Sequence, residues 1–66
     1  MRKYFTVWFT KNSETVYTDE EFNTKNEAIK HAEKHLDKYE DAMIFKVTET
    51  DNRKSYRMVE SIFNNK

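Results

Sequence analysis

Two histidines, His31 and His35, lie four residues apart within a segment that has helical periodicity. This spacing can place two imidazoles on one metal ion, but a natural site needs at least a third ligand. The nearest carboxylates, Glu27 and Asp37, fall on other sides of the helical wheel. We therefore interpret both as boundary histidines without a ligand role, with His35 at the border of the apolar stripe and His31 nearer the solvent-exposed side of the helix. The sequence predicts no metal site and no cofactor.

Carboxylates are the other candidates for chemistry, in an acidic run at 19–21 and in the pair Glu40 and Asp41. A catalytic pair needs a shaped, dry pocket that separates the two pKa values. One helix on a small sheet does not enclose such a cavity. None of the serines has a histidine at a suggestive spacing, and the chain contains no cysteine nucleophile. We predict that the protein is not an enzyme, and that the acidic runs are solvated or attract a basic partner.

The amino-acid composition excludes several further classes of function. Charged residues make up 36% of the 66 residues, and twelve basic side chains balance twelve acidic ones. That balance argues against a strongly basic nucleic-acid arm and against an acidic DNA mimic. Glycine, proline and cysteine are absent, which excludes disulfide scaffolds, cysteine zinc sites and glycine-rich phosphate loops. The apolar run at 4–9 is too short for a secretion signal or a membrane span, so we expect a cytoplasmic protein.

Alternating apolar residues and turn signals indicate two β-hairpins around one helix. Asn12 and Ser13 fit a two-residue turn, while Thr24 and Glu27 fit a capping box in which each side chain reaches the other residue's amide. The chain is interpreted as a single domain over residues 1–66 with a frayed end at 64–66. The predicted elements are strands at 3–10 and 14–22, a helix at 25–39, and strands at 42–50 and 54–63.

The order ββαββ predicts an α+β fold, a four-stranded and mostly antiparallel sheet with one helix packed on one face. The helix should present Ala28, Ile29, Ala32, Leu36 and Tyr39 to the sheet, with a lysine ridge on its opposite side. The side chains predicted to face the helix are Phe5, Val7, Phe9, Val16, Phe22, Phe45, Val47, Met58 and Ile62. Such a core is marginal, so oligomerisation is expected to contribute to stability.

One helix cannot cover both faces of this sheet. Alternation places apolar and aromatic side chains on the uncovered face, a larger apolar surface than a soluble monomer usually exposes. The partner-binding or dimer-forming residues predicted there are Tyr4, Trp8, Tyr17, Ile44, Arg57, Val59 and Phe63. We interpret this face as the interface of a homodimer, or as the binding site for a heterologous protein.

The functional expectation is a small, non-enzymatic protein-interaction module that forms a homodimer. The short chain, the lack of a catalytic constellation and the excess of surface aromatic residues suggest a regulator or inhibitor that occludes a larger protein. A composition rich in residues with AT-rich codons suggests that a phage or other mobile element encodes it. The alternative is a nucleic-acid-binding module that stacks bases on the same face. The basic residues that would hold phosphates in that alternative are Lys46, Arg53, Lys54 and Arg57.

Overall fold

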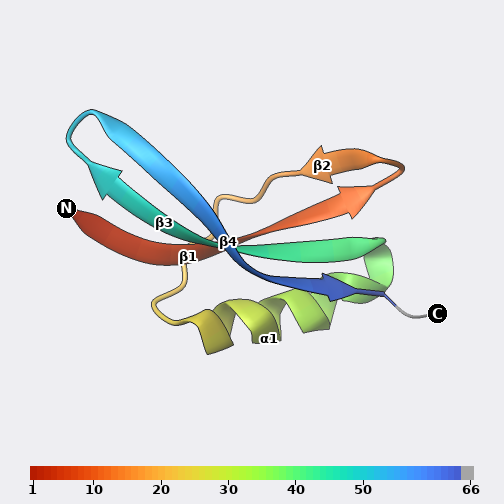
Figure 1. Cartoon of the computed structure of the whole chain (residues 1–66). Helices are drawn as coiled ribbons and strands as arrows, with labels where there is room; N and C mark the ends of the chain where they lie inside the picture. Colours follow the sequence, from red (N-terminus) through yellow and green to blue (C-terminus); the bar gives the residue numbers. More distant parts are fainter. Residues whose placement is uncertain (65–66) are drawn as a thin grey trace.

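The computed structural model describes residues 1–64 and confirms the α+β fold. The strands form one antiparallel sheet in the order β2-β1-β3-β4, and the helix lies across one of its faces (Figure 1). The β1–β2 and β3–β4 hairpins curve away from the helix at opposite ends of the molecule. In chain order the elements are β1 (Arg2–Lys11), β2 (Glu14–Val16), α1 (Lys25–His35), a 3-10 turn η1 (Leu36–Lys38), β3 (Asp41–Thr50) and β4 (Arg53–Phe63).

The first hairpin turns at Asn12 and Ser13, as predicted. Both residues have positive φ, 52° and 65°, which is the conformation that a two-residue hairpin turn requires. Phe9 then pairs with Val16. The second strand is shorter than the predicted 14–22, because pairing with β1 stops at Val16 and resumes only at one bridge between Phe5 and Phe22. Residues 17–21 therefore form a loop along the edge of β1.

The helix begins at the predicted cap. Thr24 is the N-cap residue, and its hydroxyl accepts a hydrogen bond from the Glu27 amide at 3.2 Å. The second half of the box differs, because the Glu27 carboxylate accepts a hydrogen bond from the Thr24 hydroxyl instead of from its amide. The predicted helix at 25–39 divides into α1 and η1 and ends before Tyr39. Ala28 and Ala32 are fully buried, so the helix approaches the sheet closely.

The face that β3 turns toward the helix is opposite to the predicted one. Ile44 pairs with Val7, and both are fully buried in the core against the helix. Phe45 and Val47 consequently face away from the helix, and Ala42 replaces them in the core. The reason is that β3 is apolar at nearly every position from 42 to 47, so its alternation does not determine its phase.

A β-bulge in β4 changes which of its residues face the helix. Ile44 pairs with Glu60 whereas Phe45 pairs with Met58, so Val59 is an extra residue between them. Val59 packs against the core, and Met58 lies on the uncovered face. The predicted positions of Met58 and Val59 were therefore exchanged, because an inserted residue reverses the alternation beyond it.

The end of β4 is tied to the helix rather than frayed at Asn64. The Asn64 side-chain amide donates to the carbonyl oxygens of Leu36 and Tyr39, both at 3.0 Å, and its backbone amide donates to Glu40 at 3.1 Å. These bonds satisfy carbonyls that a helix end leaves unpaired. The rest of the predicted frayed end, residues 65 and 66, lies outside the described residues. Within residues 1–64, no helix is both long enough and apolar enough to cross a membrane.

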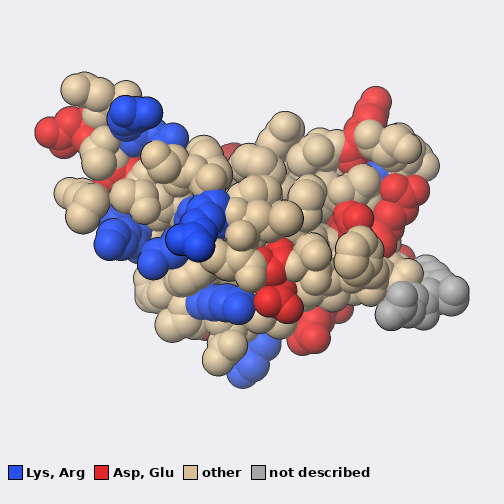
Figure 2. Space-filling view, in the orientation of Figure 1, with Lys and Arg blue, Asp and Glu red and all other residues tan. Residues whose placement is uncertain are grey.

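Opposite charges gather at the two ends of the strands. Figure 2 shows lysine and arginine over the β3–β4 hairpin and the neighbouring start of β1, whereas aspartate and glutamate dominate the opposite end of this view. The second hairpin and the start of β1 carry Arg2 and Arg53 together with Glu49, and at the other end Glu40 lies near Lys11. The net charge is zero, and in this view the charges of the two signs are unevenly distributed between the two ends.

Candidate functional site

The uncovered face of the sheet is built around Trp8. Its ring lies 4.3 Å from Phe45, 4.7 Å from Tyr17 and 5.2 Å from Tyr56, measured between ring centroids. Cross-strand pairing adds Met43 beside Trp8 and Met58 beside Phe45. We call the aromatic face the set Trp8, Tyr17, Met43, Phe45, Tyr56, Met58 and Phe63.

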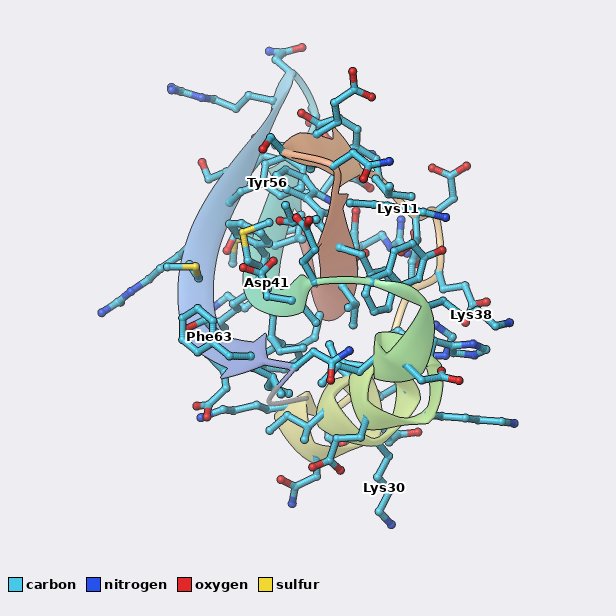
Figure 3. The ribbon with its side chains drawn as sticks, turned by 90° about the vertical axis from the view of Figure 1, so that its right-hand side faces the viewer. Lys11, Lys30, Lys38, Asp41, Tyr56 and Phe63 are labelled. Atoms are coloured by element: carbon cyan, nitrogen blue, oxygen red, sulfur yellow. The ribbon has the colours of Figure 1, made fainter. Side chains whose placement is uncertain are left out.

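Several side chains of the aromatic face are exposed although they are large and apolar. The exposed fraction is 66% for Tyr17, 65% for Phe63, 54% for Met58 and 46% for Tyr56. Figure 3 shows Tyr56 and Phe63 toward opposite ends of β4, while Lys30 projects from the helix away from the sheet. The apolar surface therefore extends along most of the sheet instead of being confined to one point.

A small cavity opens at the Tyr4 end of the aromatic face, between β1, β4 and the acidic loop at 19–21. Its volume is about 170 Å³. Tyr4 and Thr6 on β1 are 8% and 4% exposed and form its floor beside Trp8. We call this cavity the slot; its lining residues are Tyr4, Thr6, Trp8, Thr18, Asp19, Glu20, Glu21, Lys54 and Tyr56.

Hydrogen bonds hold the acidic loop against β1. The Thr6 hydroxyl donates to the Glu20 carbonyl at 3.0 Å, and the Thr18 hydroxyl donates to the Val7 carbonyl at 2.6 Å. Reciprocal backbone bonds of 2.8 Å between Phe5 and Phe22 anchor the end of the loop. The loop thus replaces the missing part of the second strand and forms one wall of the slot.

An ion-pair network borders the slot. Arg2 donates hydrogen bonds to Glu21 and to Glu49, the latter at 2.9 Å, and Lys54 lies 3.3 Å from Glu49. The Arg2 guanidinium also lies 5.0 Å from the ring centroid of Tyr4. The hydrogen bond from Lys54, and to a smaller extent the one from Arg2, lowers the pKa of Glu49. The hydrogen bond to Glu49 raises the pKa of Lys54, and the hydrogen bonds to Glu49 and Glu21 raise the pKa of Arg2.

Most of the predicted partner-binding residues share one face, but not all of them. Tyr4, Trp8, Tyr17 and Phe63 lie on the uncovered side as predicted. Ile44 and Val59 belong to the core instead, and Arg57 pairs with Lys46 on the helix side of the sheet. Sequence reasoning missed Met43, Phe45, Tyr56 and Met58, and pairing of β3 with β1 was the signal needed to find them.

The basic residues of the nucleic-acid alternative are not gathered on the aromatic face. Lys46 shares the helix side with Phe5 and Arg57, while Lys54 is paired with Glu49 on the other side. Arg53 lies at the tip of the second hairpin. Phosphates bound by Lys46 or Arg57 would therefore leave their bases on the side of the sheet opposite Trp8.

The two histidines lie beside the acidic loop. Their rings are 4.6 Å apart, and His31 Nδ1 is 3.6 Å from Glu20 Oε2. His31 also packs against Phe22 at 5.0 Å, and its side chain is 19% exposed, so it lies closer to the core than predicted. Within the described part of the chain, no group of three or more histidines, cysteines or acidic residues is arranged to hold a metal ion.

Comparison with known proteins finds no protein-family model, no curated protein and no solved structure that matches this chain.

Proposed function

We propose that this protein is a non-enzymatic protein-interaction module that forms a homodimer through its aromatic face. The observation that carries this proposal is the exposure of Tyr17, Tyr56, Met58 and Phe63 on one side of one sheet. Aromatic residues and methionine are enriched in interface cores, and a contiguous apolar surface of this kind marks an interaction site in a small soluble protein.

The size of the face suits a second copy of the chain. A standard stable interface covers about 800 Å² on each partner. The described chain exposes 4931 Å² and has principal extents of 41, 23 and 17 Å. The aromatic face belongs to a sheet of long strands, each of β1, β3 and β4 having ten or eleven residues. Face-to-face packing of two such sheets has room for an interface of standard size.

The distribution of charge also favours a second copy. In a twofold interface, a patch away from the axis contacts a different patch of the partner, and this contact occurs twice. When the strands of the two copies run in opposite senses, the lysine and arginine at the hairpin end in Figure 2 approach the aspartate and glutamate at the other end of the partner. Zero net charge leaves no overall repulsion between the copies.

We further propose how such a module acts. A chain of 66 residues without a catalytic constellation exerts its effect by covering the surface of a larger protein. Its role is that of a cytoplasmic regulator or inhibitor, and its many residues that have AT-rich codons (Lys, Asn, Phe and Tyr) suit a phage or other mobile element. Surfaces outside the dimer contact, such as the lysine ridge of α1 at Lys30 and Lys34, remain available for that larger partner.

Light scattering behind size-exclusion chromatography tests the dimer. We expect twice the chain mass for the native protein across micromolar to millimolar concentrations. Tyr17→Ser and Phe63→Ser should shift the mass to that of a monomer, whereas the control Lys34→Ser on the exposed side of the helix should not. A native protein that stays monomeric throughout, or a Phe63→Ser variant that dimerises like the native protein, would refute the proposal.

The same protein samples can be titrated with a single-stranded oligonucleotide. Binding that weakens steeply with salt, and that is lost in a Trp8→Ala variant, would favour the nucleic-acid alternative. We expect no such binding, because Lys46 and Arg57 lie on the side of the sheet opposite Trp8.

A further inference from the structure

We propose that the slot binds one cationic side chain, a guanidinium or an ammonium group, presented by another polypeptide. This site shares Trp8 and Tyr56 with the aromatic face of the proposed dimer, but Tyr4 and the acidic wall lie outside that face. It assigns a partner chemistry, a basic polypeptide segment, that self-association alone does not require.

The volume of the slot limits what it can hold. Sites for small-molecule ligands and cofactors usually have volumes of about 300–1,000 Å³. The slot has about 170 Å³ and is open to solvent on the uncovered side of the sheet. A single side-chain head group is therefore the kind of occupant that its size favours.

The floor of the slot attracts cations. Tyr4, Trp8 and Tyr56 all line it, and the face of an aromatic ring carries negative electrostatic potential, with tryptophan binding cations best. The protein already uses this chemistry at the edge of the slot, where the Arg2 guanidinium lies 5.0 Å from the Tyr4 ring and donates to Glu21 and Glu49.

The walls of the slot carry negative charge that is only partly compensated. Asp19, Glu20 and Glu21 line it against one cation, Lys54. Arg2 pairs with Glu21, and Lys54 pairs with Glu49 outside the lining. Among the described residues, Glu20 has one charged neighbour.

That neighbour is His31, whose Nδ1 lies 3.6 Å from Glu20 Oε2. Because His31 packs against Phe22 on the helix side of the sheet, the Glu20 carboxylate is directed away from the slot, and its backbone carbonyl bonds to Thr6 on the slot side. Asp19 takes part in none of the ion pairs found among residues 1–64. A cation entering over the rings would therefore approach Asp19, whose charge no ion pair offsets.

The slot is also held in shape before any ligand arrives. The hydroxyls of Thr6 and Thr18 bond across the junction between β1 and the acidic loop, and Trp8 is fixed between Tyr17, Phe45 and Tyr56. A preformed site loses less conformational entropy on binding. The acidic loop is therefore positioned to receive a side chain without rearranging.

Trp8 gives a direct probe, because it is the only tryptophan of the chain and lies in the slot. The native protein is titrated with arginine blocked at both backbone ends, followed by Trp8 fluorescence and by the NMR signal of its indole N–H. Blocked citrulline, which has nearly the same shape without the charge, is the matched control ligand. We expect saturable binding of blocked arginine that weakens with salt, and no comparable binding of citrulline.

Variants assign the effect to the acidic wall. The variant Asp19→Asn should weaken the binding of blocked arginine by about threefold, the range expected for one exposed charge interaction. Glu33→Gln, on the exposed side of α1, removes a carboxylate elsewhere and should leave the affinity unchanged. Circular dichroism of each variant establishes that it is folded before the titration is interpreted.

Repeating the titration with Phe63→Ser separates this site from the proposed dimer. If Phe63→Ser binds blocked arginine and the native protein does not, the dimer covers the slot. If both the native protein and Phe63→Ser bind it, the slot stays open in the dimer. Each of these results supports a cation site. Equal responses to arginine and citrulline, no binding by either protein, or native affinity in the Asp19→Asn variant would overturn it. The oligomeric state, measured on the same samples, decides the dimer independently.

Discussion

At the scale of single residues, Glu49 links the start of β1 to the second hairpin. Its carboxylate accepts from Arg2 at 2.9 Å and lies 3.3 Å from Lys54. These contacts lower the pKa of Glu49 from an ordinary value of 4.5, the hydrogen bond from Lys54 being the largest cause. A carboxyl whose pKa is lower in the folded state stabilises the fold above its unfolded-state pKa, and this contribution is lost as the pH falls through the folded-state value.

The prediction is that Glu49→Gln makes unfolding less dependent on pH in the acidic range. The native protein should lose stability as the pH falls below about 4.5, and the variant should lose less over the same interval. Urea unfolding at a series of pH values measures this slope. Salt should reduce the difference, since the network is at the surface. A variant with the native slope would show that these ion pairs do not contribute, and Glu33→Gln serves as the control.

At the scale of elements, β3 is the strand whose orientation matters most. It is the central strand beside β1 and contacts the helix with Ile44 and Ala42 while presenting Met43 and Phe45 to the aromatic face. Both sides of β3 are therefore apolar. A shift of its phase by one residue would exchange core for surface along the whole strand.

Comparing Ile44→Ala with Met58→Ala tests this phase in solution. Ile44 is fully buried, so its truncation should lower the free energy of unfolding by about 2–5 kcal/mol. Met58 is 54% exposed in the single chain, so in the monomeric Phe63→Ser background its truncation should cost less than about 1 kcal/mol. Denaturant unfolding measures both. Equal costs, or a larger cost for Met58→Ala, would contradict the observed arrangement and favour the phase predicted from alternation.

The elements differ in how far local sequence determines them. The turn at Asn12 and the cap at Thr24 depend on neighbouring residues only, and both were predictable. The phase of β3 depends on its pairing with β1, which no local pattern of apolar residues reveals. The bulge at Val59 has no marker such as glycine, so the reversal it causes in β4 was equally hidden. The aromatic face inherited these errors, because most of its residues lie on β3 and β4.

The acidic loop shows a different limit of prediction from the sequence. The run at 19–21 reads as a solvated segment, and its side chains are indeed exposed. Its place in a site follows from two hydroxyl bonds, Thr6 to the Glu20 carbonyl and Thr18 to the Val7 carbonyl. These contacts connect residues 11 or 14 positions apart in the chain. Side-chain bonds over such separations are not visible in periodicity or composition.

At the scale of the whole molecule, the fold buries few large side chains. The largest fully buried ones are Phe9, Ile44, Val7 and Val47, and the helix contributes mainly Ala28 and Ala32 to the core. For a chain of this length, hydrophobic burial barely exceeds the conformational entropy lost on folding. Burial of the aromatic face in a dimer would add apolar area that the isolated chain leaves in water.

Coupling between assembly and folding then makes stability depend on protein concentration. A dimer that unfolds to monomers gains stability by mass action as the chain concentration rises. We expect the midpoint of thermal unfolding to increase over a hundredfold range of concentration for the native protein. In Phe63→Ser the midpoint should be lower and independent of concentration, because the variant folds as a monomer. A native midpoint that does not move with concentration would mean that the small core is sufficient alone, and that the exposed row from Tyr17 to Phe63 is kept for a different protein.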